Sequence, residues 1–218
     1  MSNSRFRSLL AALTFTFILP ALHAPSLYAQ EASGAWTREE AQNIAVQVGK
    51  KITALTTYSV FDDVNIALNG KTVILHGYAS RPALKSDATK AVKSIHGVES
   101  VDNQLQVLPF SPSDDRVRTE VYNAIYTQPS LRKYNAGAGN LASASSPDTS
   151  ITAAGGITED PPLGFHAIHI IVKSGNVILT GTVLNKQDSE LAEIKAKSAF
   201  GAHGITNQLT IQGAPTGR

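Results

Sequence analysis

The hydrophobic positions of residues 37–58 repeat at helical spacing. Four aliphatic residues recur three or four positions apart: Ile44, Val48, Ile52 and Leu55. Thr37 precedes them and Glu40 follows Thr37 by three residues, which is the spacing of a capping box at a helix N-terminus. The pattern predicts an amphipathic helix that begins at Thr37.

After this helix the period changes from helical to alternating. Val64, Ile66 and Leu68 alternate with polar or small residues, as in a half-buried strand. Asn69-Gly70 predicts a two-residue type I′ hairpin turn, and residues 72–76 return as the second strand.

A second helix and a last strand complete this unit. Ala88, Val92 and Ile95 share one helical face, and Gly97 stands where a left-handed residue ends a helix. Residues 101–108 then read as a strand. A strand, a helix and a strand in succession imply parallel pairing with a right-handed crossover.

The chain repeats this unit. Residues 64–107 align without a gap on residues 168–211 at a constant offset of 104. The strand Val73-Ile74-Leu75-His76-Gly77 falls on Val177-Ile178-Leu179-Thr180-Gly181, and Asn103-Gln104-Leu105 falls on Asn207-Gln208-Leu209. In the second copy, Ser174-Gly175 predicts the hairpin turn.

A helix also precedes the second copy. It is predicted to begin at Ser113 and to stop before Pro129. Its apolar residues again share a face: Val117, Val121, Ala124 and Ile125. The predicted fold class is therefore α+β, with two αββαβ modules, each a three-stranded mixed sheet with two helices packed on one face.

These patterns divide the chain into segments. We expect a first module over residues 37–109 and a second over residues 110–213, with a short segment at 30–36 and a tail at 214–218. Residues 135–164 interrupt the second module and are rich in Ala, Gly, Ser, Thr and Pro, so we expect a disordered insert there.

Six glycines fall at turns, strand ends and helix ends, and none belongs to a phosphate-binding motif. We interpret them as structural turn and cap residues: Gly70, Gly77, Gly97, Gly175, Gly181 and Gly201.

The N-terminus has the pattern of an export signal. Arg5 and Arg7 precede an apolar stretch at residues 9–19 that Pro20 ends, and this stretch covers only about half of a bilayer core. We predict a signal peptide cleaved after Ala29 and a periplasmic or secreted protein. Cleavage removes two of the 19 basic residues and none of the 17 acidic ones, so the remainder is close to neutral. A nucleic-acid partner is therefore not expected.

The sequence contains no cysteine. Disulfides, thiolate metal ligands and a cysteine nucleophile are therefore excluded, and so is a lipoprotein anchored through cysteine.

No residue pattern indicates catalysis, metal binding or a cofactor. His166 and His169 lie three apart on a strand, which points their rings to opposite faces. The adjacent carboxylates Asp62-Asp63, Asp114-Asp115 and Glu159-Asp160 diverge in the same way, and Asp114-Asp115 suits the first turn of a helix. We expect no enzyme activity, no catalytic residue and no cofactor.

In combination these elements resemble the BON domain of bacterial envelope proteins. The resemblance rests on the hairpin at residues 64–77, on Gly97-Val98 and on Val101-Asp102-Asn103-Gln104-Leu105, with a second copy that has Gly201-Ala202 in place of Gly-Val. It implies a periplasmic protein with tandem BON modules, similar to osmotically inducible envelope proteins. The functions it implies are phospholipid binding, envelope integrity under osmotic stress and chaperone-like help to other envelope proteins.

One helix face suggests a binding surface. Arg118, Tyr122 and Tyr126 recur every four residues beside Arg116, and arginine with tyrosine suits an anionic phospholipid or membrane surface. The alternative is that Tyr122 and Tyr126 border the core. The alternative function is a chaperone or protein-interaction scaffold that binds no lipid.

The sheets offer a second surface. Ala67, Ile74, Ile171 and Ile178 are expected to face away from the helices, although they are apolar in both copies. Two interpretations are open. Either the neighbouring module or a partner covers these residues, or they are scattered exposed aliphatic residues.

Overall fold

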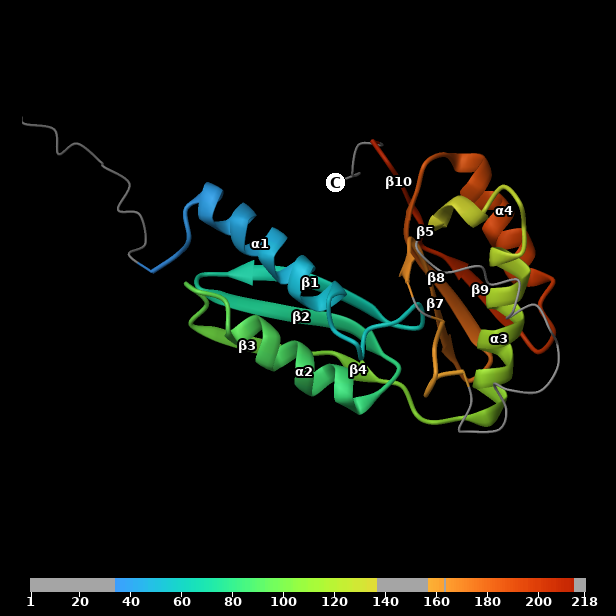
Figure 1. The fold of residues 1–218 in the computed structure, drawn as a ribbon, viewed down its shortest axis with the longest axis horizontal. Coiled ribbons are helices and arrows are strands. Elements are labelled where there is room, and N and C mark those ends of the chain that lie inside the picture. The colour runs from blue at the N-terminus through green and yellow to red at the C-terminus, as the bar shows by residue number, and fades with distance from the viewer. Residues whose placement is uncertain (1–33, 137–156, 163, 214–218) are drawn as a thin grey trace, which may run out of the picture. The chain divides into compact units, whose positions relative to one another are not determined.

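The computed structural model describes residues 34–136, 157–162 and 164–213. The predicted signal peptide, residues 137–156 of the expected insert and the tail lie outside the described residues. The described chain forms two α+β modules, each with a mixed sheet and two helices on one face (Figure 1).

The first module follows the predicted order. Its elements are α1 (Arg38–Thr53), β1 (Asp63–Asn69), β2 (Thr72–Ala79), α2 (Pro82–Lys93), β3 (Ser100–Asn103) and β4 (Gln106–Val107). The Thr37 side chain accepts from the Glu40 amide and the Glu40 carboxylate accepts from the Thr37 amide, so the capping box begins α1 as expected. The sheet order is β1-β2-β3, with β1 antiparallel and β3 parallel to β2.

The last strand of this module is interrupted, where the sequence predicted one strand over residues 101–108. β3 and β4 both pair with β2 in parallel, and Gln104 and Leu105 separate them. Leu105 is almost fully buried in the core, and its backbone amide donates a hydrogen bond to the Asn103 side-chain oxygen at 3.1 Å. The interruption therefore turns a large apolar side chain inward.

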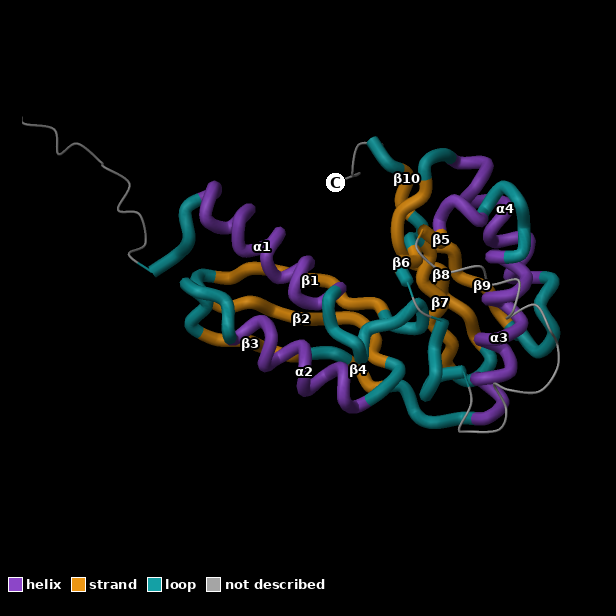
Figure 2. The backbone as a smooth tube through the Cα atoms, in the orientation of Figure 1, coloured by secondary structure: helices purple, strands orange, loops and turns teal. Residues whose placement is uncertain are grey.

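The second module repeats the arrangement with additions. Its elements are α3 (Pro112–Tyr126), the 3-10 helix η1 (Arg132–Tyr134), β5 (Asn135–Ala136), β6 (Phe165–His166), β7 (Ile168–Lys173), β8 (Asn176–Val183), α4 (Lys186–Lys197), β9 (Gly204–Asn207) and β10 (Thr210–Ile211). β7 is antiparallel to β8, while β9 and β10 pair with β8 in parallel. β5 and β6 form a short antiparallel ribbon (Figure 2).

Two local predictions were wrong. The N-cap of α3 is Ser111 and not Ser113, because Pro112 can occupy the first helical position and the Ser111 hydroxyl accepts from the Asp114 amide at 3.2 Å. In the first hairpin Asn69 pairs with Thr72, so the turn is Gly70-Lys71 and only Gly70 has positive φ. A type I′ turn requires positive φ at both central residues, which Ser174 and Gly175 supply in the second hairpin.

Gly77 and Gly181 show why the repeat keeps glycine at the end of its hairpin. Their φ angles are 119° and 110°, and a Cβ there would collide with the carbonyl oxygens of Asp63 and Ala167 respectively. The other four predicted turn and cap glycines also have positive φ: Gly70, Gly97, Gly175 and Gly201.

The described ends of the predicted insert are folded. Asn135 and Ala136 pair with His166 and Phe165, and Ile157 is 2% exposed within the second core. The fold therefore extends into both ends of residues 135–164.

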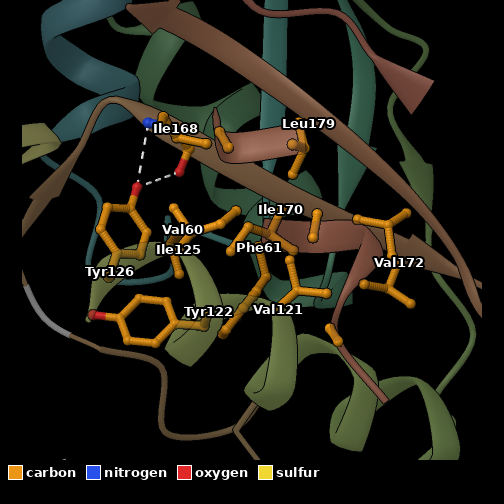
Figure 3. Close-up of a cluster of buried hydrophobic side chains, with 14 of the residues drawn as sticks. Val60, Phe61, Val121, Tyr122, Ile125, Tyr126, Ile168, Ile170, Val172 and Leu179 are labelled. Carbon is orange, nitrogen blue, oxygen red and sulfur yellow. Dashed lines mark hydrogen bonds between the residues drawn. The ribbon is translucent and has the colours of Figure 1, made fainter. Parts of the chain in front are cut away.

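A segment of the first module belongs to the core of the second. Val60 and Phe61 are buried in the cluster that α3, β7, β8 and α4 form, as the close-up in Figure 3 shows. The Ile170 amide donates to the Val60 carbonyl at 2.8 Å. We call residues 58–63 the bridging segment, because they lead into β1 while packing along the edge of β7.

The same segment covers part of the other face of β7. The Tyr58 and His169 ring centroids are 5.5 Å apart, and the Thr180 hydroxyl donates to Asp63 at 3.2 Å. Ile171, which shares this face with His169, has no exposed surface. Of the other residues predicted to face away from the helices, Ala67 is exposed, while Ile74 and Ile178 are half-buried.

Candidate functional site

The lipid surface expected on α3 is not a surface in this structure. Tyr122 and Tyr126 are 3% and 5% exposed, and both belong to the core of the second module. The Tyr126 hydroxyl donates to the Ile168 carbonyl at 2.5 Å, and Figure 3 shows the ring against β7. Burial raises the pKa of Tyr122 to about 12 and also raises the pKa of Tyr126. The alternative, that these tyrosines border the core, is correct.

Arg118 is buried as well, at 2% exposure. Its Nη1 donates to the Asp115 carboxylate at 2.7 Å and to the Thr158 hydroxyl at 3.2 Å, and its Nη2 donates to the Val172 carbonyl at 2.9 Å. A buried charge needs such partners. Arg118 therefore ties α3 to β7 and to the far end of the insert, and only Arg116 of the predicted group is exposed.

The adjacent acids Asp114 and Asp115 also have structural partners. The Asp114 carboxylate accepts from the amides of Ser174 and Gly175 at 2.9 and 2.8 Å. These two residues form the positive-φ turn between β7 and β8. Asp114 therefore fixes the hairpin turn to the first turn of α3, where a carboxylate is also favoured by the helix dipole.

The two histidines lie on separate sides of the second module. The His166 Nε2 is 3.2 Å from the Tyr122 hydroxyl on the helix side, whereas His169 contacts Tyr58. Burial lowers the pKa of His166 to about 4, and burial also lowers the pKa of His169 against the opposing influence of Asp63. Within the described ranges no three His, Asp, Glu or Cys side chains group to hold a metal ion.

The exposed candidate surface lies on α4. Asn185 caps this helix, and the apolar residues that the helix buries are Ala192 and Ala196. On the outside, Ile194 is 61% exposed and Phe200, just beyond the helix end, is 87% exposed. Lys197 lies between them in sequence with a 58% exposed side chain. We call Ile194, Lys197 and Phe200 the α4 row.

The α4 row could have been predicted by comparing the two copies of the repeat position by position. At the offset of 104, Ile194 matches Lys90 and Phe200 matches His96, while Lys197 matches Lys93. The first module therefore carries polar residues where the second carries apolar ones. Ala192, Ala196 and Leu191 supply the apolar contacts of α4 with the core, and Ile194 and Phe200 remain mostly exposed.

No helix among the described residues has the length and apolar character needed to cross a bilayer.

The sequence matches the model of the BON domain over residues 41–109 and again over residues 155–213. The chain belongs to the BON-domain family. The two matches cover more than half of the chain; the first lies within residues 37–109 and the second takes in β6 to β10 without α3. BON domains are generally non-catalytic and are linked to membrane or phospholipid binding and to the cell envelope.

Two solved structures of a Chlamydia trachomatis protein are similar to this BON-domain chain. Both are of CdsD, described as a structural protein of the type III secretion system. One is 15% identical, with a TM-score of 0.25, and covers 78% of this chain and 92% of that chain. The other, of the C-terminal domain, is 16% identical, with a TM-score of 0.24, and covers 76% and 96%. Scores this low support no functional inference. No curated protein matches the sequence.

Proposed function

We propose that this tandem BON-domain chain is an exported, non-catalytic protein that binds anionic phospholipid surfaces through the α4 row and supports envelope integrity under osmotic stress. The observation that carries the proposal is the 87% exposure of Phe200, which follows the exposed Lys197 by three residues and the exposed Ile194 by six. The family's link to membranes and the signal-like residues 1–29 support the same compartment.

The chemistry of the row suits a shallow membrane contact. Phe and Ile side chains each gain roughly 1.5–3 kcal/mol when fully withdrawn from water. A lysine near an anionic surface adds about 1 kcal/mol, and this part falls with salt. The pairing of Lys197 with Glu193 at 2.5 Å lowers the net charge of the helix face. The expected binding is therefore weak, reversible and more apolar than electrostatic.

Vesicle flotation tests the proposal. The chain from Gln30 onward should float with phosphatidylglycerol vesicles more than with phosphatidylcholine vesicles, and added salt should reduce the difference. Replacing Phe200 and Ile194 by serine should abolish flotation, and Lys197→Glu should weaken it. Unchanged flotation of the double variant would refute the α4 row as the lipid site.

The first module supplies the matched controls. Lys93→Glu makes the same charge change at the position that corresponds to Lys197. The residues that correspond to Ile194 and Phe200 are Lys90 and His96, so this position lacks the apolar neighbours of the row. Lys93→Glu should leave flotation almost unchanged if the row on α4 is the contact. A further control, Phe110→Ser at the start of the second module, removes an exposed phenylalanine outside the row (69% exposed) and should also leave flotation almost unchanged.

A chaperone or protein-interaction scaffold is the alternative function. The exposure of three phenylalanines, Phe110, Phe165 and Phe200, favours it, because apolar side chains on the surface can bind unfolded clients. A chaperone would suppress aggregation of an unfolded client without vesicles. It would also tolerate Lys197→Glu, since an apolar client does not need that charge.

A further inference from the structure

The bridging segment shows how the second module completes its open edge. β7 lies at the edge of its sheet, and Val60 and Phe61 lie along it with Phe61 against the Tyr122 ring, 6.4 Å between centroids. As a result, Ile168, Ile170 and Val172 have no exposed surface.

The corresponding edge of the first module is open. The residues that match Ile168, Ile170 and Val172 are Val64, Ile66 and Leu68, and all three are half-buried instead of buried. In the part of the chain that the structure describes, no backbone hydrogen bond reaches the outer edge of β1.

The backbone of this edge is oriented as in β7. Ile66 pairs with Leu75 in the register in which Ile170 pairs with Leu179, and it is the Ile170 amide that donates outward to Val60. The Ile66 amide therefore points outward too, and an unpaired strand edge of this kind accepts an added segment.

The helix beside this edge leaves room for a ring. α1 and α3 each bury three aliphatic residues spaced four apart, with Val48 in the middle in α1 and Val121 in the middle in α3. The next residue is Gly49 in α1 and Tyr122 in α3. No atom lies within 4 Å of the position that a Cβ on Gly49 would take. The first module thus lacks a counterpart of Tyr122, the ring that contacts Phe61 in the second module.

One residue of the bridging segment recurs in the second copy. At the offset of 104, Phe61 matches Phe165, which is 61% exposed. The local backbone is also alike in the two copies. Two residues after each phenylalanine, the Asp63 carbonyl lies against Gly77 and the Ala167 carbonyl lies against Gly181. Ahead of Phe165, the Gly164 carbonyl lies 3.1 Å from His166 Nδ1 and retains a second lone pair.

The geometry points to head-to-tail self-association. Gly164 and Phe165 of one chain add to the β1 edge of a second copy, with Phe165 beside Gly49 and the Gly164 carbonyl accepting from the Ile66 amide. The donor and receiver lie on different modules, so the contact is heterologous and every bound copy offers another free edge. The inference is independent of the proposed lipid binding, because it needs no membrane.

Sedimentation velocity of the chain from Gln30 onward, without lipid, tests this assembly. The mean mass should rise with concentration up to about 1 mM. Phe165→Ser, which removes the donor ring, should raise the dissociation constant at least about tenfold. Gly49→Glu places a charge where the Phe165 ring of the other copy would pack, and should raise the dissociation constant to the same extent. Glu is a better helix former than Gly, so this change should not unfold α1.

Mixing the two variants separates this arrangement from a symmetric dimer. Phe165→Ser keeps the receiving edge and Gly49→Glu keeps the donor, so an equal mixture should form dimers and nothing larger. Phe110→Ser and Gln47→Glu are controls that should associate like the unaltered chain. A chain that stays monomeric at about 1 mM, or association that survives both variants, would overturn the inference.

Discussion

The Val60 carbonyl accepts a hydrogen bond from the Ile170 amide at 2.8 Å, which joins the first module to the edge strand of the second. The neighbouring Phe61 side chain is fully buried in the second core. Because a residue of one module completes the core of the other, we expect the second module to lose stability when the bridging segment is altered.

Phe61→Ala tests this dependence. It should cost about 3–5 kcal/mol, as is usual for removal of a buried phenylalanine, and should speed hydrogen exchange of the Ile170 amide. Phe165→Ala, at the matched but exposed position, should cost less than about 0.5 kcal/mol. Urea unfolding and exchange measured by NMR give both quantities. Equal effects of the two variants would contradict an interlocked core.

Arg118 is expected to act in stability and not in surface binding. Arg118→Ala leaves the buried Asp115 carboxylate without its cation, which should cost about 3–5 kcal/mol in urea unfolding. Arg116→Ala, two residues away and exposed, should cost less than about 0.5 kcal/mol. The paired change Arg118→Met with Asp115→Leu should recover much of the loss. If the two single variants were equally stable, the buried ion pair would have no structural role.

Stability should fall with acid because of His166. Its pKa is lowered by burial to about 4, whereas an unfolded histidine titrates near 6.5, so the unfolded state takes up the proton first as pH falls. The contribution is complete above about pH 6.5 and decreases by about 3 kcal/mol as pH falls toward 4. The lowered pKa of His169, which faces Asp62, Asp63 and Tyr58, acts in the same direction.

Urea unfolding at about pH 7.5 and about pH 4.5 measures this acid sensitivity. His166→Gln should reduce the difference between the two conditions, while His96→Gln, at an exposed position, should leave it unchanged. An unaltered difference in His166→Gln would assign the acid sensitivity to other groups.

Asp114 should hold the second hairpin turn. Asp114→Ala removes two hydrogen bonds from a carboxylate to the amides of Ser174 and Gly175, which should cost about 2–4 kcal/mol. Exchange of these two amides should accelerate more than that of the Ile170 amide. Glu120→Ala, on the exposed side of α3, is the control. A uniform acceleration throughout β7 and β8 would indicate global unfolding instead.

The sequence predicted the module well because its signals are local. The capping box of Thr37 and Glu40 and the alternation through Val64, Ile66 and Leu68 depend on near neighbours and appear in the structure as expected. The start of α3 was misplaced because Ser111 and Ser113 both flank Pro112, and only the capping hydrogen bond distinguishes them.

The candidate site was harder to predict. Arg118, Tyr122 and Tyr126 have the spacing of an exposed basic and aromatic stripe, and the same spacing fits a helix that packs on more than one side. The bridging segment and Thr158 close that extra side from distant parts of the sequence. A helical pattern contains no information about which distant segment covers a face.

By itself, the sequence determined the family, the two αββαβ units and the glycines at their turns, because periodicity, capping and backbone freedom act between near neighbours. Only the tertiary structure decided which surfaces remain for function. Phe61 is buried and its repeat partner Phe165 is exposed, although both stand at the same place in the repeat. Burial is decided by contacts between segments far apart in the chain, and these differ between copies that share one local pattern.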